Sequence, residues 1–172
     1  ARELEKTGTH ILAIKDMAGL LKPAAAKLRI GALKQEVDLP IHLHTHDTSG
    51  ISAATVLSAV DAGVDIFDAA IDSMSGLTSQ PNMGSIVAAL ENSARRTDID
   101  ARHVRMLSHY WENVREQYAA FEPDMHAGAS EVYVHEMPGG QYTNLREQAR
   151  SLGVEARWPE IARAYTEVNR LF

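Results

Sequence analysis

The chain has 172 residues, enough to bury a sizeable core, and its 17 Lys and Arg against 23 Asp and Glu leave a formal net charge of −6. This balance argues against an electrostatic surface for nucleic acid or for an anionic membrane. The absence of cysteine excludes disulfides, zinc–cysteine sites and cysteine nucleophiles. The sequence contains no run of about 18 apolar residues, so no membrane span is predicted.

Residues 1–96 alternate between predicted strands and predicted helices. Residues 1–7 resemble the end of a helix that stops at Gly8 rather than a signal peptide, so we expect the chain to begin inside a fold. Short apolar runs predict buried strands, and such alternation predicts parallel strands joined by crossover helices. The expected elements are strands at 10–16, 41–47 and 64–71, and helices at 23–37, 53–62 and 83–96.

After about residue 97 the pattern becomes helical. Apolar residues at three- and four-residue spacing, such as Val104, Leu107 and Trp111, indicate an amphipathic helix that ends before Pro123. The two glycines after Pro138 are expected in a turn, because they lack the spacing of a phosphate-binding loop. The expected elements are helices at 104–121, 144–152 and 158–172, with a loop at 129–141.

Three strands cannot close a barrel, and a complete (β/α)8 barrel needs roughly 200 residues or more. We therefore predict an α/β fold in two parts. Residues 1–96 form a partial TIM barrel, its last three strand–helix units, and residues 97–172 form an α-helical extension. In such folds ligands bind beyond the carboxyl ends of the strands.

The stretch IHLHTHDTSG, residues 41–50, carries the strongest chemical pattern. Successive side chains of a strand point to opposite faces, which places His42, His44 and His46 on one face. Imidazole is the commonest side-chain metal ligand. The spacing favours a metal site over the alternative of a hydrogen-bonded or surface histidine cluster.

Lys15 and several carboxylates lie at the same predicted strand ends. Lys15 is suited to a Schiff base, to an anionic substrate or, as a carbamate, to a metal; alternatively it pairs with Asp16 or with another carboxylate. For Asp47 a helix cap is favoured over orienting a histidine. Asp68 and Asp72 are expected to share a face, and structural hydrogen bonding is favoured over catalysis for both.

Five stretches of the chain, in this order, resemble the carboxyltransferase domain of pyruvate carboxylase: HILAIKDMAGLLKP, IHLHTHDTSG, DSMSGLTSQPNMGS, YWENVREQYAAFE and EMPGGQYTNL. KDMAG and HTHDT also suit a transcarboxylase subunit or the oxaloacetate decarboxylase α subunit, and a metal-dependent aldol or Claisen-type barrel also uses an HxH pair. The remaining segments favour pyruvate carboxylase. A structural or assembly piece without catalysis is the alternative of a different class.

The resemblance implies transfer of a carboxyl group from carboxybiotin to pyruvate, giving oxaloacetate, at a divalent metal, zinc or manganese. The implied ligands are Lys15 as a carbamate, His44 and His46, together with an aspartate upstream of this chain. His42 is then not a ligand, so two of the three histidines that the strand spacing places on one face remain as candidate ligands. Met17 is expected to line the pyruvate pocket.

The resemblance also implies partners outside this chain. Biotin is carried on a separate domain, the rest of the barrel belongs to the same polypeptide, and the family forms homotetramers in the bacterial cytoplasm or the mitochondrial matrix. The threonine that shuttles the proton is expected past Phe172 and is not Thr143, so no residue here is assigned as the catalytic acid or base. We therefore expect the isolated chain to be inactive.

Overall fold

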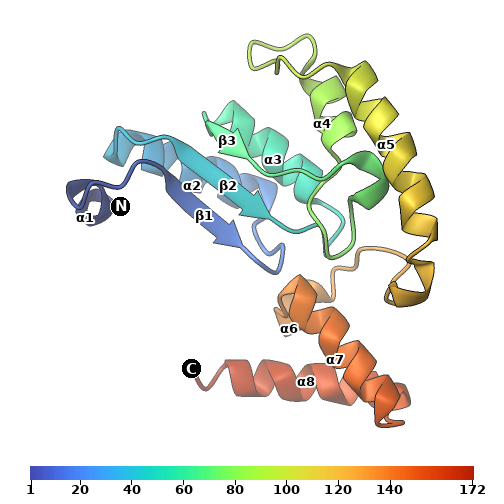
Figure 1. Cartoon of the computed structure of the whole chain (residues 1–172). Helices are drawn as coiled ribbons and strands as arrows, with labels where there is room; N and C mark the ends of the chain where they lie inside the picture. The colour runs from blue at the N-terminus through green and yellow to red at the C-terminus, as the bar shows by residue number, and fades with distance from the viewer.

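A three-stranded parallel sheet organises the N-terminal half of the molecule (Figure 1). The computed structural model describes residues 1–172. The strands are β1 (Leu12–Asp16), β2 (Ile41–Thr45) and β3 (Ile66–Phe67), in the spatial order β1-β2-β3, and both neighbouring pairs run parallel. The predicted parallel alternation is therefore confirmed. A short helix, α1 (Arg2–Lys6), precedes the sheet.

Two helices cover one face of the sheet, and the opposite face carries the partly exposed histidines of β2. They are α2 (Pro23–Glu36) and α3 (Ser52–Asp61), and both lie behind the strands in Figure 1. Ile41 and Leu43 of β2 are completely buried in the core that these helices form with the sheet. The residues between and after them on β2, His42 and His44, lie on the opposite face and are partly exposed.

The third strand is shorter than the expected range of 64–71. Only Ile66–Phe67 pairs with β2, after which the backbone leaves the ladder and forms an isolated bridge between Ala70 and Asn82. The 3₁₀ turn η1 (Asp72–Met74) and helix α4 (Met83–Leu90) follow. The helix stops before residue 96, where the Leu90 carbonyl accepts from both the N–H and the hydroxyl of Ser93, at 3.0 and 2.9 Å, in a tight turn.

The C-terminal half is helical, as predicted. Helix α5 (Ala101–Glu116) packs on α4 and η1, and it begins before residue 104 because the Asp100 side chain caps it by accepting from the Arg102 N–H. The expected range of 104–121 is interrupted, since the separate turn η2 (Ala119–Phe121) follows the helix. Helix α6 (Val132–His135), helix α7 (Gly139–Ser151), the turn η3 (Glu155–Arg157) and helix α8 (Trp158–Asn169) complete the fold.

The expected loop at 129–141 is wrong, and so is the helix start at residue 144. Helix α6 lies inside that range, and α7 already begins at Gly139. A tertiary contact sets this start, because the Gly139 N–H donates to the Met17 carbonyl after β1, 3.1 Å away. A side chain at Gly139 would also lie 3.0 Å from the Thr78 Cβ, so the helix needs glycine to approach the strand ends. None of the helices combines the length and the apolar character that a membrane crossing requires.

Gly19 joins the turn after β1 to the end of β2. Its φ of +69° favours glycine, and a methyl group there would lie 2.3 Å from the His46 carbonyl oxygen. We expect Gly19→Ala to lower the free energy of unfolding by about 2–5 kcal/mol, the sum of a left-handed residue and an overpacked contact. Urea denaturation of the protein that contains this chain measures the change.

The matched control is Gly140→Ala in the first turn of α7, where a methyl group would meet no atom within 4 Å. There alanine should be neutral or stabilise the helix by up to about 1 kcal/mol. Equal unfolding midpoints for the two variants would show that the close approach at Gly19 is not a constraint.

Candidate metal centre

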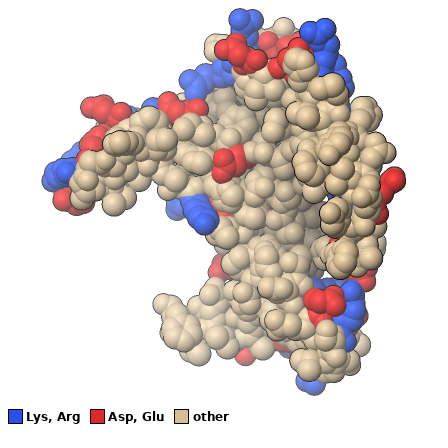
Figure 2. Space-filling model, viewed as in Figure 1, with Lys and Arg blue, Asp and Glu red and all other residues tan.

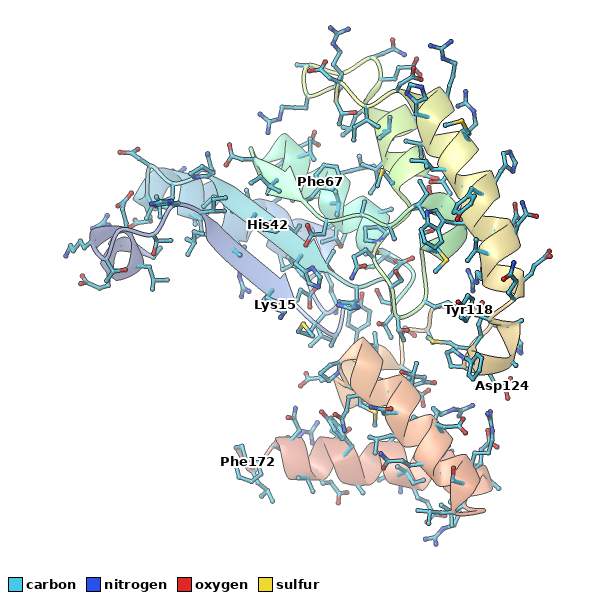
Figure 3. The ribbon with its side chains drawn as sticks, viewed as in Figure 1. Lys15, His42, Phe67, Tyr118, Asp124 and Phe172 are labelled. Carbon is cyan, nitrogen blue, oxygen red and sulfur yellow. The ribbon has the colours of Figure 1, made fainter.

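The carboxyl ends of β1 and β2 bring together the side chains predicted as metal ligands. Lys15 of β1 stands directly opposite His44 of β2 in the parallel register, so both side chains leave the same face of the sheet. His46 follows the strand by one residue and shares this face. Figure 3 labels Lys15 at the end of β1 and His42 on β2 beside it, and Figure 2 shows the surface hollowed between the strands and the C-terminal helices.

The rings of His44 and His46 face each other through their Nε2 atoms, which are 3.0 Å apart. Each ring is anchored by its other nitrogen: His44 Nδ1 lies 2.7 Å from Asp68 Oδ2, and His46 Nδ1 lies 2.6 Å from the Thr78 carbonyl oxygen. A carbonyl only accepts, so His46 carries its hydrogen on Nδ1. In a neutral imidazole the Nε2 atom is then an unprotonated acceptor.

Asp68 is the acceptor for His44 in the same way. Burial by itself would raise the pKa of Asp68, but hydrogen bonds from His44 and His42 outweigh it and lower the pKa below the ordinary value of 3.8. An ionised carboxylate only accepts, which places the hydrogen of His44 on Nδ1 as well. Two Nε2 lone pairs therefore converge, and the arrangement requires a proton or a metal cation between them.

A divalent metal fits this pair of imidazoles. Two metal–nitrogen bonds of about 2.0–2.1 Å can reach one ion from nitrogens that lie 3.0 Å apart. No group of three His, Cys, Asp or Glu side chains in the chain converges to hold an ion. The family resemblance implies Lys15, as a carbamate, as a further ligand, and Lys15 lies on the same face of the sheet as the two imidazoles.

The alternative pairing of Lys15 with Asp16 is wrong. The Asp16 carboxylate accepts from the backbone N–H groups of Leu20 and Leu21, each at 2.9 Å, and from the Thr45 hydroxyl, also at 2.9 Å. Lys15 itself is exposed, and no carboxylate lies within ion-pair distance of its amine. Its amine is free for chemistry, while Asp16 ties the turn after β1 to the end of β2.

Two further carboxylates have structural partners, as predicted. Asp47 Oδ1 accepts from the N–H and hydroxyl of Ser52, the first residue of α3, at 3.0 and 2.5 Å. Ile51 holds the N-cap position itself, so Asp47 caps the first helical N–H from the preceding loop and makes no hydrogen bond to a histidine. Asp72 Oδ1 accepts from the Gly84 N–H at the start of α4, 2.7 Å away. Asp68 and Asp72 therefore have separate partners, which are two histidines for Asp68 and the start of α4 for Asp72.

His42, the third histidine of the pattern, turns towards Asp68 rather than towards the other two rings. Its Nε2 lies 2.8 Å from Asp68 Oδ1. The sequence analysis favoured structural hydrogen bonding for Asp68, and the structure shows that its partners are His42 and His44. The sequence analysis missed the Thr78 carbonyl, since a backbone group carries no residue-type signal.

Space for a small ligand lies beside the His44 ring. A cavity of about 590 Å³ is bordered by His44 and Asp68 on one side and by Gln80 and Met83 on another. Met17, which follows Lys15 by two residues, is 40% exposed at the same strand end. Its backbone carbonyl accepts a hydrogen bond from the Gly139 N–H, which ties this residue to the start of α7.

Known families match most of the chain. Residues 1–110 match the family described as HMGL-like, and residues 132–172 match the conserved carboxylase domain. The chain is 57% identical over 172 residues to pyruvate carboxylase of Staphylococcus aureus and 49% identical over 174 residues to mitochondrial pyruvate carboxylase of Homo sapiens. These matches cover 100% and 99% of this chain but 15% of each relative, so the chain spans a small part of their length.

Solved structures agree with these relatives. The carboxyl transferase domain of Rhizobium etli pyruvate carboxylase with pyruvate superposes with a TM-score of 0.97 at 64% identity, covering 99% of this chain and 29% of that chain. The same domain has been solved with pyruvate and biocytin. The complete multifunctional enzyme from Rhizobium etli also matches with a TM-score of 0.97 at 64% identity, over 99% of this chain and 16% of that one.

The contacts of Asp47 generate a test of its role. We expect Asp47→Ala to lower the free energy of unfolding by about 1 kcal/mol through loss of the α3 cap, with metal affinity unchanged. Asp61→Ala, at the exposed other end of α3, is the control and should cost nothing, because an acidic group is unfavourable at a helix C-terminus. Calorimetric unfolding and metal titration measure both effects; weaker metal binding at full stability would assign Asp47 to the histidines instead.

Proposed function

Because this chain belongs to the pyruvate carboxylase family, as a segment of its carboxyltransferase domain, we propose that it forms part of the site that transfers a carboxyl group from carboxybiotin to pyruvate, giving oxaloacetate. The α/β fold, with its parallel three-stranded sheet, agrees with a segment of the family's barrel. The activity is proposed for the complete protein. This chain matches only 15% of the length of the Staphylococcus aureus relative.

One observation carries the proposal: the convergence of the His44 and His46 Nε2 atoms, 3.0 Å apart, on the face that Lys15 shares. We assign His44, His46 and Lys15, as a carbamate, to a divalent metal. Nitrogen and oxygen ligands suit zinc or manganese equally, so the donor set does not choose between them. When bound, such an ion acts as a Lewis acid that stabilises negative charge on a substrate oxygen.

The residues of this chain hold the metal and orient its ligands, and none of them is assigned a proton transfer. The imidazoles present unprotonated nitrogens because Asp68 and the Thr78 carbonyl occupy their Nδ1 hydrogens. Met17, exposed at the rim of the same strand end, is proposed to line the pyruvate pocket. The substrate class is supported by the related Rhizobium etli domain, which was solved with pyruvate and with biocytin.

The remaining assignments concern the complete protein. We propose that biotin arrives on a separate domain, that the protein forms homotetramers, and that it works in a bacterial cytoplasm or a mitochondrial matrix. Bacterial and mitochondrial relatives support the last point. A division into a barrel segment, 1–96, and a helical extension, 97–172, is proposed from the change in element pattern between them.

Replacing the lysine tests the metal assignment. We expect Lys15→Ala in the complete protein to lower both metal content and oxaloacetate formation by more than about 100-fold, since losing groups behind the ligands already costs 10–100-fold. Metal analysis, an oxaloacetate assay and carbon NMR of protein exposed to isotope-labelled bicarbonate are the measurements, the last detecting the carbamate.

Lys27→Ala, which removes an exposed amine from α2, is the matched control and should keep metal, carbamate and activity. His44→Ala should lose metal and oxaloacetate formation, as Lys15→Ala does. Loss of activity in the histidine variant but not in Lys15→Ala would exclude the carbamate and favour an aldol or Claisen-type metal barrel.

A further inference from the structure

We propose that Asp68 is a positioning residue that fixes the ring orientation and the tautomer of His44, and that His42 in turn holds Asp68. The inference rests on the proposed metal site and deepens it. It gives a role to the one histidine of the pattern that does not converge with the others, and to a carboxylate that the metal assignment does not use.

The contacts of the Asp68 carboxylate carry the proposal. One oxygen lies 2.7 Å from His44 Nδ1 and the other lies 2.8 Å from His42 Nε2, so each oxygen has its own imidazole. The ionised carboxylate accepts both bonds, and each ring therefore donates. For His44 this leaves Nε2 as the free acceptor, and that atom points at His46 Nε2.

The backbone places Asp68 for this purpose. Asp68 is the first residue beyond β3, and its N–H still donates to the Leu43 carbonyl, 3.1 Å away. Leu43 lies between His42 and His44 on β2, so the carboxylate stands level with the gap between the two rings. Its side chain is 39% exposed, compared with 24% for His44, so the pair is partly shielded from water.

His42 has no other polar partner across the strands. Its neighbour in the β1 register is Ala13, whose methyl group cannot form a hydrogen bond. A donated bond from His42 restrains the second carboxylate oxygen, and with it the plane of the group that His44 meets. The partner of His46 is a backbone carbonyl, so Asp68 is the side chain through which the orientation of this imidazole pair can be changed by mutation.

The test uses the complete protein, stripped of metal and titrated with Mn²⁺ alone, followed by nitrogen NMR of the histidine rings. Asp68→Asn keeps the volume but removes the charge and one acceptor oxygen. We expect Mn²⁺ affinity to fall 10–100-fold, the usual loss when the partner of a metal-binding histidine is changed, and the His44 signals to leave the Nδ1–H pattern. His42→Ala should weaken binding less, and His42→Gln, which keeps an N–H donor, should restore part of it.

Asp65→Asn is the matched control. Asp65 accepts from the Ile41 N–H and from Lys34, away from the rings, so its loss should reduce stability and leave Mn²⁺ affinity unchanged. If Asp68→Asn binds Mn²⁺ like the parent while His44→Ala does not, the positioning role is overturned and the metal site stands. A parent protein that binds neither Mn²⁺ nor Zn²⁺ overturns the proposed function, and the positioning role with it.

Nitrogen NMR of the parent protein tests the same proposal without depending on how the variants fold. Without metal, its His44 ring should still carry a hydrogen on Nδ1, because Asp68 accepts that bond whether or not a proton lies between the two Nε2 atoms. A His44 Nδ1 atom without hydrogen in that spectrum would contradict the role assigned to Asp68.

Discussion

The alternation of side chains along β2 sends Ile41 and Leu43 into the helix-covered core and His42, His44 and His46 to the other side of the sheet. A slip of one residue in the register would exchange these two sets, burying imidazoles among aliphatic side chains and exposing the core. Burial of the apolar set therefore enforces the position of the polar set. The packing of α2 and α3 is in this sense the first element of the site.

Polar contacts at the strand ends then separate structural carboxylates from the reactive groups. Asp16 and Asp47 hold the turns that follow β1 and β2, and each accepts hydrogen bonds from nearby N–H and hydroxyl donors. Lys15 is left without a counterion. The hydrogen-bonded carboxylates maintain the backbone geometry of these turns, and the unpaired Lys15 amine is available for chemistry.

The helical extension is connected to the same edge of the sheet. The Gly139 N–H bonds to the Met17 carbonyl and the Ala129 N–H bonds to the Thr48 carbonyl, so α6 and α7 are attached to the loops that follow β1 and β2. The proposed division near residue 96 is thus a change of architecture across which hydrogen bonds continue. In the complete protein these contacts would place the extension at the mouth of the barrel, where Met17 lies.

The sequence by itself determined the features that repeat over a few residues: three parallel strand–helix units, the face shared by His44 and His46, the lysine on the neighbouring strand, and the family. Each depends on spacing within one element, and local sterics enforce it. Only the tertiary structure decided which partner each polar group finds. The Thr78 carbonyl meets a histidine 32 residues away, and Asp68 bridges two rings more than 20 residues earlier. The start of α7 at Gly139 depends likewise on a carbonyl beyond β1, because contacts between distant segments leave no periodic trace in the sequence of either segment.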